Sequence, residues 1–202
     1  MPRGQAPGDP ITAAKELCLR LLATAPRTRA QLAAALRRRG VPERVTLDVL
    51  GRFTEAGLID DAAFASAWVE SRHHGRGLSR RALAAELLQR GVCDEDVRAA
   101  IGDLDPRQEA ATARRLVSSR LSATHGQPPQ VRSRRLVSLL ARRGYPPGLA
   151  FRVVREALEE QGIDSLEAGL DSLEAGLDAA ETGMDESGPG APDGWPCVAG
   201  PD

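Results

Sequence analysis

The sequence contains few aromatic residues and no long apolar run. Aromatic side chains make up 3% of its 202 residues, and its apolar residues are mostly Ala, Leu and Val. A large β-rich core is disfavoured by this composition. Because Ala, Leu and Arg are among the best helix formers, we expect an all-α fold.

Cysteine is equally scarce. Cys18, Cys93 and Cys197 are odd in number and far apart, so they indicate neither a disulfide framework nor a zinc-binding spacing. No segment approaches the roughly 18 apolar residues of a membrane span. The first ten residues, MPRGQAPGDP, lack the apolar core of a secretory signal. We therefore expect a cytoplasmic protein with no membrane partner and no metal or other cofactor.

Lysine is almost absent, and basic residues stop before position 163. Residues 1–162 hold all 27 basic residues, 26 of them Arg, against 18 acidic ones, whereas residues 163–202 hold ten acidic residues. This segregation predicts an anionic partner for the basic part, with nucleic acid the commonest case. The alternative is a solvated surface whose charge has no specific partner.

One segment of the sequence occurs three times. Its copies begin at Leu32, Leu83 and Leu136, with offsets of 51 and 53 residues. Each copy has leucines four residues apart, which is typical of one apolar face of a helix. Each copy then reads Arg-Gly followed by an apolar residue, and the glycines are Gly40, Gly91 and Gly144. Since Gly readily adopts the left-handed conformation that ends helices, the pattern predicts helix, glycine turn and helix.

A further helix is predicted before each copy, over about 10–25, over about 62–73 and from Asp105-Pro106 onward. Helix caps are expected at Asp9, at Thr28 with Gln31, and at Asp105 with Gln108. The sequence thus predicts three tandem three-helix repeats in an elongated, curved array. The predicted segments are a disordered terminus 1–9, repeats 10–60, 61–105 and 106–162, and an acidic low-complexity tail 163–202.

The middle repeat resembles the RecX family. The family pattern has an acid, Phe-Ala, an aromatic residue, an Arg, a basic glycine-containing turn, Glu-Leu, and a closing Arg or Lys, Gly, and Ile or Val. The matching positions here are Asp61, Phe64-Ala65, Trp68, Arg72, Gly75-Arg76-Gly77, Glu86-Leu87 and Arg90-Gly91-Val92. The resemblance extends over about residues 11–160.

The resemblance implies a function as well as a fold. RecX proteins are tandem three-helix repeats that bind the RecA recombinase and its filament on single-stranded DNA. They inhibit strand exchange, ATP hydrolysis and co-protease activity, and so act in homologous recombination, DNA repair and the SOS response. We therefore expect a monomeric regulator of RecA, with weak nonspecific DNA binding and no enzymatic activity.

Two aromatic residues lie four apart on one helix face of the middle repeat. Phe64 and Trp68 are expected to form the core of this repeat with Leu83, Leu87 and Gly91, because so small a unit needs its few aromatic rings inside. A base-stacking platform is the alternative function for the two rings.

Arginines gather in three clusters, and the predicted RecA- and DNA-binding surface is drawn from them. Guanidinium groups bind carboxylates and phosphates bidentately. The first cluster is Arg72, Arg76, Arg80 and Arg81, the second is Arg37, Arg38 and Arg39, and the third is Arg132, Arg134, Arg135, Arg142 and Arg143. Repeat symmetry would place the three clusters on related edges as a basic stripe.

Catalytic and metal-binding residues are not indicated. His73 and His74 diverge by about 100° on a helix and have no third ligand nearby in the sequence. Asp60 and Asp61 are better explained by helix capping. We therefore predict no catalytic, cofactor-binding or metal-binding site.

Two other classes of function are compatible with three-helix units. One is a helix-turn-helix transcription regulator, although three unequal tandem units argue against the two-fold symmetry that such proteins share with palindromic sites. The other is a helical adaptor that binds only protein.

The acidic tail is not covered by the resemblance. It contains DSLEAGL twice, at 164–170 and 171–177. One hypothesis is that the tail folds against the basic repeats and competes with their anionic partner. The alternative is a disordered, solubilising segment.

Overall fold

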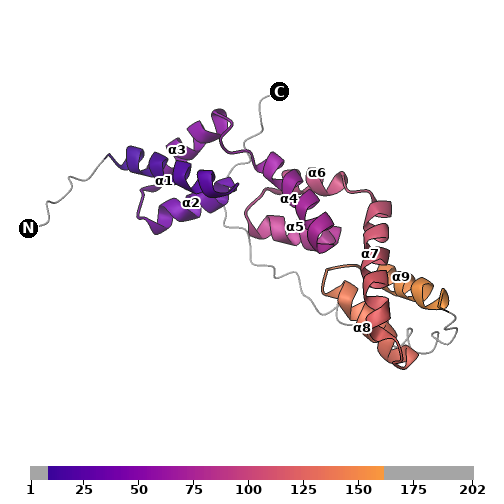
Figure 1. Cartoon of the computed structure of the whole chain (residues 1–202). Coiled ribbons are helices and arrows are strands. Elements are labelled where there is room, and N and C mark those ends of the chain that lie inside the picture. Colours follow the sequence, from indigo (N-terminus) through magenta and orange to yellow (C-terminus); the bar gives the residue numbers. More distant parts are fainter. Residues whose placement is uncertain (1–8, 162–202) are drawn as a thin grey trace, which may run out of the picture. The chain divides into compact units, whose positions relative to one another are not determined.

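The computed structural model describes residues 9–161, and over these residues the chain is helical without any strand (Figure 1). Its elements are α1 (Pro10–Thr24), α2 (Arg29–Arg38), α3 (Glu43–Glu55), α4 (Asp61–Arg76), α5 (Arg80–Gln89), α6 (Asp94–Gly102), α7 (Pro106–Leu121), the short 3₁₀ helix η1 (Ser122–Thr124), α8 (Pro129–Ala141) and α9 (Pro147–Glu159). The predicted all-α fold of three-helix units is confirmed.

The helices belong to two compact units. The described residues up to Trp68 form the first unit together with Glu86–Ala100, and Val69–Ala85 form the second with the residues from Ile101 onward. Helices α4 and α5 therefore contribute to both units. The repeat boundaries and the curved outline stay predictions, and the predictions for residues 1–8 and 163–202 fall outside the described part of the chain.

Side-chain caps begin several of the helices. The Asp9 carboxylate accepts from the backbone N–H of Ile11, 3.2 Å away, at the start of α1. Thr28 and Gln31 form the predicted reciprocal capping box of α2. Asp105 accepts from the Arg107 N–H at 2.8 Å and starts α7. These bonds satisfy N–H groups that have no partner within their own helix.

The glycine of each repeat ends a helix as predicted. In the first repeat the Gly40 N–H donates to the Arg37 carbonyl and the Val41 N–H donates to the Leu36 carbonyl, the two bonds of a Schellman turn. The same two bonds recur after α5 and α8. The three glycines have positive φ angles, which are 72° at Gly40, 75° at Gly91 and 79° at Gly144. Only glycine takes this conformation without strain.

The core of the first unit lies between α1, α2 and α3, which contact one another. Leu32 and Leu36 from α2 and Val49 and Leu50 from α3 are fully buried. The leucines therefore form the apolar face that their four-residue spacing predicts.

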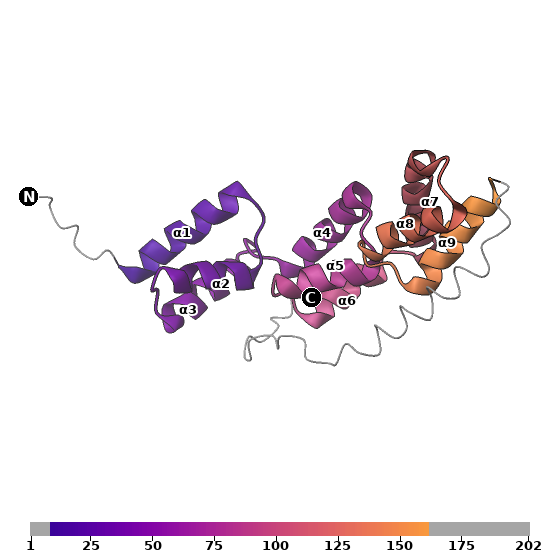
Figure 2. The ribbon, with the colours of Figure 1, turned by 90° about the horizontal axis from the view of Figure 1, so that it is seen from below.

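The core of the second unit lies between α7, α8 and α9, which contact one another and lie together in both views (Figures 1 and 2). Its buried residues come mainly from the inward faces of these helices and include Val117, Leu136, Leu140, Val153, Val154 and Leu158. The leucines of the third copy of the repeat therefore have the same role as those of the first.

Within the first unit, the glycine turn after α5 packs on the start of α2. A Cβ atom added at Gly91 would lie 2.3 Å from the Cβ of Ala30. The Thr28 hydroxyl donates to the Arg90 carbonyl at 2.6 Å, and the Arg29 N–H donates to the Asp61 carboxylate at 2.9 Å. The turn after α5 and Asp61, both in the second repeat, thus supply hydrogen-bond acceptors at the start of α2 in the first repeat.

Within the second unit, the glycine turn after α8 packs on the start of α5 in the same way. A Cβ atom at Gly144 would lie 2.8 Å from the Cβ of Ala82. The Ser79 N–H donates to the Arg143 carbonyl at 3.0 Å, and the Arg80 N–H donates to the Glu109 carboxylate at 2.8 Å. The contact between successive repeats is therefore itself repeated.

One predicted helix end is wrong. Helix α4 continues past His73 through Gly75 to Arg76, so the turn that the resemblance implied at Gly75-Arg76-Gly77 begins only at Gly77. The helix ends where the Gly77 N–H donates to the His73 carbonyl and Gly77 takes a φ of 62°. Gly75 has space for a side chain and stays helical, and only the second glycine acts as the stop.

Gly91→Ala should destabilise the protein more than Gly40→Ala. Both substitutions place Ala at a positive φ, at a cost of about 1–2 kcal/mol. Only Gly91→Ala also drives a Cβ into Ala30, whereas Gly40 has no neighbour within 4 Å. We expect Gly91→Ala to lose about 1–3 kcal/mol more, measured by urea unfolding. Equal losses from the two substitutions would contradict the close packing of the glycine turn.

Asp61 should make the unfolding free energy depend on pH. Burial is the main cause that raises the pKa of the Asp61 carboxyl above its usual range, and the Arg29 N–H opposes it. Because the folded state holds this proton more tightly than the unfolded state, stability falls as pH rises through the raised pKa. We expect the stability of the wild type relative to Asp61→Asn to decline as pH rises above the ordinary range of an aspartate, at about pH 4. Parallel curves for the two proteins would show that the carboxyl is not perturbed.

Candidate anion-binding site

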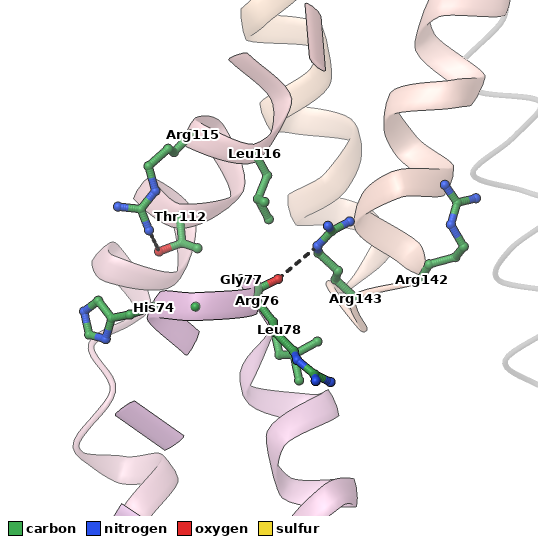
Figure 3. A pocket seen from close by; sticks show the side chains of 10 residues that line it. His74, Arg76, Gly77, Leu78, Thr112, Arg115, Leu116, Arg142 and Arg143 are labelled. Atoms are coloured by element: carbon green, nitrogen blue, oxygen red, sulfur yellow. Dashed lines mark hydrogen bonds between the residues drawn. The ribbon is translucent and has the colours of Figure 1, made fainter. Parts of the chain in front are cut away.

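A pocket of about 480 Å³ lies in the second unit, where the end of α4, helix α7 and the turn after α8 bring arginines together (Figure 3). Four of its ten lining residues are Arg76, Arg115, Arg142 and Arg143. The other lining residues are His74, Gly75, Gly77, Leu78, Thr112 and Leu116. None of these ten residues is acidic, so the pocket has a surplus of positive charge.

The backbone at Gly77 forms one wall of the pocket. A Cβ at this position would lie 2.8 Å from a methyl carbon of Leu116, so glycine is required for the close approach as well as for its positive φ. The buried Tyr145 hydroxyl donates to the Gly77 carbonyl at 3.1 Å. This bond gives the aromatic residue after Gly144 a specific role in holding the wall.

The Arg143 side chain is held in place by backbone carbonyls. Its Nε donates to the Arg76 carbonyl at 3.1 Å, as drawn in Figure 3, and its Nη1 donates to the Leu139 carbonyl at 3.4 Å. A guanidinium group carries five N–H donors, so these two bonds fix the group and leave donors for a ligand.

Arg115 is positioned through a buried histidine. His73 is 2% exposed, and its Nδ1 lies 2.9 Å from the Leu78 carbonyl, which can only accept, so Nδ1 carries a proton. Its Nε2 lies 2.9 Å from the Thr112 hydroxyl, which in turn accepts from Arg115 at 3.3 Å. This chain of bonds connects the turn after α4 to a pocket arginine on α7.

Three of the four arginines of the pocket follow one another across the view of Figure 3, and Arg76 projects below them. Arg115 is on one side, Arg142 is on the other side, and Arg143 lies between them. Arg76, Arg115 and Arg142 are exposed, and Arg143 is half-buried. Such a row fits an extended ligand that carries several negative charges better than a single small anion.

The structure brings only three of the predicted arginines into this pocket, namely Arg76, Arg142 and Arg143. The other predicted residues lie elsewhere. Arg37, Arg38, Arg39, Arg81, Arg134 and Arg135 are exposed outside it, and Arg72 and Arg80 are half-buried. The sequence reasoning missed Arg115 and Thr112, because they stand on α7, outside every arginine cluster.

Arg132 corrects the third arginine cluster. It is 4% exposed, and its guanidinium donates to the Thr124 hydroxyl at 3.2 Å and to the side chain of Gln161. Its charge serves the packing of α8 and is absent from the surface that the cluster was predicted to form.

In the middle repeat, Leu83 and Leu87 are fully buried, whereas Phe64 and Trp68 are half-buried. The two rings stack with centroids 5.6 Å apart. The Trp68 indole donates to the Glu86 carboxylate at 2.8 Å, and the Arg90 guanidinium lies 3.7 Å from the Trp68 ring centroid. These contacts favour packing over base stacking as the role of Trp68.

No described helix is long and apolar enough to cross a bilayer. Within residues 9–161, no three His, Cys, Asp or Glu side chains are grouped as metal ligands would be.

Residues 14–53 match the first three-helix domain of RecX, and residues 60–101 match the second. Regulatory protein RecX of Thermobifida fusca is 62% identical to this chain over 159 residues, which are 79% of this chain and 86% of that protein. The chain belongs to the RecX family. Regulatory protein RecX of Streptomyces coelicolor is 56% identical over 163 residues, with 81% and 87% of the two chains covered.

Solved RecX structures have the same fold. RecX from Lactobacillus salivarius superposes with a TM-score of 0.67 at 16% identity, over 73% of this chain and 96% of that one. The relatives are named as regulatory proteins, which agrees with the expectation of a regulator rather than an enzyme. The resemblance read from the middle repeat is therefore confirmed for family and fold.

Tyr145 is the only tyrosine of the chain, so its ionisation can be followed alone. Burial, with Glu109 as the second cause, raises the pKa of its hydroxyl to about 12. We expect phenolate absorbance to appear about two pH units later in the folded protein than in denaturant, where tyrosine titrates near pH 10. Because the raised pKa belongs to the folded state, stability should fall above about pH 10. Ionisation near pH 10 with helicity retained would contradict the burial of this hydroxyl.

Proposed function

We propose that this RecX protein binds RecA and its filament on single-stranded DNA, and that it inhibits strand exchange, ATP hydrolysis and co-protease activity. The proposal rests mainly on one observation, which is that the chain belongs to the RecX family. The excess of arginine over acidic residues before position 163 supports it, since both RecA carboxylates and DNA phosphates are partners for guanidinium groups.

Exposed and half-buried arginines supply the proposed contact surface. The pocket residues Arg76, Arg142 and Arg143 form its best-defined part, because Arg143 is fixed by two backbone carbonyls. The remaining members proposed for this surface are Arg37, Arg38, Arg39, Arg72, Arg80, Arg81, Arg134 and Arg135. We propose that the protein acts in the cytoplasm as a monomer and that any binding to bare DNA is weak and nonspecific.

The test is RecA ATP hydrolysis on single-stranded DNA, titrated with the purified protein. We expect inhibition at substoichiometric amounts. Arg76→Glu with Arg142→Glu should raise the concentration needed for half inhibition by about tenfold or more, because repulsion replaces attraction at the surface. The matched control is Arg120→Glu with Arg152→Glu, two exposed residues outside the pocket that carry the same change of charge.

Helicity by circular dichroism should be the same for both double variants. Equal inhibition by the pocket variant and the wild type would remove the pocket from the contact surface. Tight binding to one duplex sequence with no effect on RecA would instead indicate a transcription regulator, and binding to protein without any effect on RecA activity would indicate an adaptor.

A further inference from the structure

The arginine pocket and the acidic end of the sequence have opposite charges. After Gln161 the chain has ten acidic residues and no Lys or Arg. Six of the acids are spaced alternately three and four residues apart, and they are Asp164, Glu167, Asp171, Glu174, Asp178 and Glu181. The row of guanidinium groups in the pocket calls for an extended ligand with several carboxylates or phosphates.

Several acids of the second unit are already bound elsewhere. Glu109 accepts from the Arg80 N–H, Glu156 pairs with Arg114 at 3.2 Å, and Glu159 pairs with Arg155 at 3.7 Å. None of them lines the pocket. The four pocket arginines therefore lack a neutralising partner among the residues that line it, and their mutual repulsion favours an anionic occupant.

The acidic segment begins close enough to reach the pocket. It follows α9, which belongs to the same unit as the pocket. Asp171 is ten residues beyond Gln161, which allows a reach of up to about 33 Å. The described residues of this unit, 69–85 and 101–161, number fewer than a hundred. A compact unit of that size has a radius of gyration of only about 12 Å. The connection also keeps the segment at an effective concentration of about millimolar.

We infer that the arginine pocket is a carboxylate-binding site whose occupant is the chain's own acidic segment, residues 163–181. Side-chain carboxylates of the segment accept hydrogen bonds from Arg115, Arg142 and Arg143 along the row. The segment competes there with the anionic partner, so the full chain binds that partner less tightly than its arginines allow. This last step rests on the proposed function, whereas occupation of the pocket does not.

The direct test uses the full-length chain with its six spaced acids replaced by Asn or Gln. A labelled peptide of residues 163–182 is titrated against this protein at low and moderate salt. We expect saturable binding that weakens with salt, because exposed charges are screened over about 10 Å at 0.1 M ionic strength. Adding Arg115→Gln and Arg142→Gln should weaken peptide binding by about fivefold or more.

The control pair is Arg120→Gln with Arg152→Gln in the same neutralised chain. Both residues are exposed outside the pocket, and the loss of charge is the same. We expect this pair to change peptide affinity by less than about twofold. Equal weakening by the two pairs, or no binding of the peptide at all, would overturn the inference.

The regulatory step has its own readout. The neutralised chain should inhibit RecA ATP hydrolysis at several-fold lower concentration than the wild type, and adding the peptide should reverse this gain. An unchanged inhibitory concentration would overturn the competition. If the peptide binds the pocket while neither protein affects RecA, the proposed function fails and the carboxylate site stands.

Discussion

The rest of the structure depends on one kind of contact. In it, a glycine that ends one helix packs closely against the start of an earlier helix. Gly91 meets Ala30, and Gly144 meets Ala82, with no room for a side chain. The positive φ that ends the helix and the missing Cβ that permits the contact are both properties of glycine. A single residue type therefore sets the helix length and the approach of the next repeat.

The pocket forms beside the second of these contacts, and its arginines are not all repeated beside the first. The repeat offsets relate Arg76 to Ala25 and Arg142 to Gln89, and both counterparts are uncharged. Arg143 corresponds to Arg90, which lies over the Trp68 ring instead. The two contacts thus share their backbone geometry but differ in side-chain chemistry. The arginines of the pocket therefore distinguish one copy of a repeated structural unit from the other.

The helices and their glycine stops could be predicted because they follow from local patterns: leucine spacing, capping residues and Arg-Gly. The pocket could be predicted only in part. Arg76, Arg142 and Arg143 stand in visible clusters, but Arg115 and Thr112 reach the pocket through the packing of α7, which no local pattern encodes. The burial of Arg132 was missed for the same reason, since its partner Gln161 is 29 residues away.

The charge of the protein surface also depends on which backbone groups the acidic side chains bind. Asp9, Asp60 and Asp105 cap helices. Asp61 and Glu109 close the two contacts between repeats, from positions that do not correspond in the repeat alignment. A carboxylate at a helix start is favoured by the helix dipole, so the fold itself selects acids for these places. The fold therefore uses several of its acids at backbone N–H groups, where their negative charge meets the start of a helix.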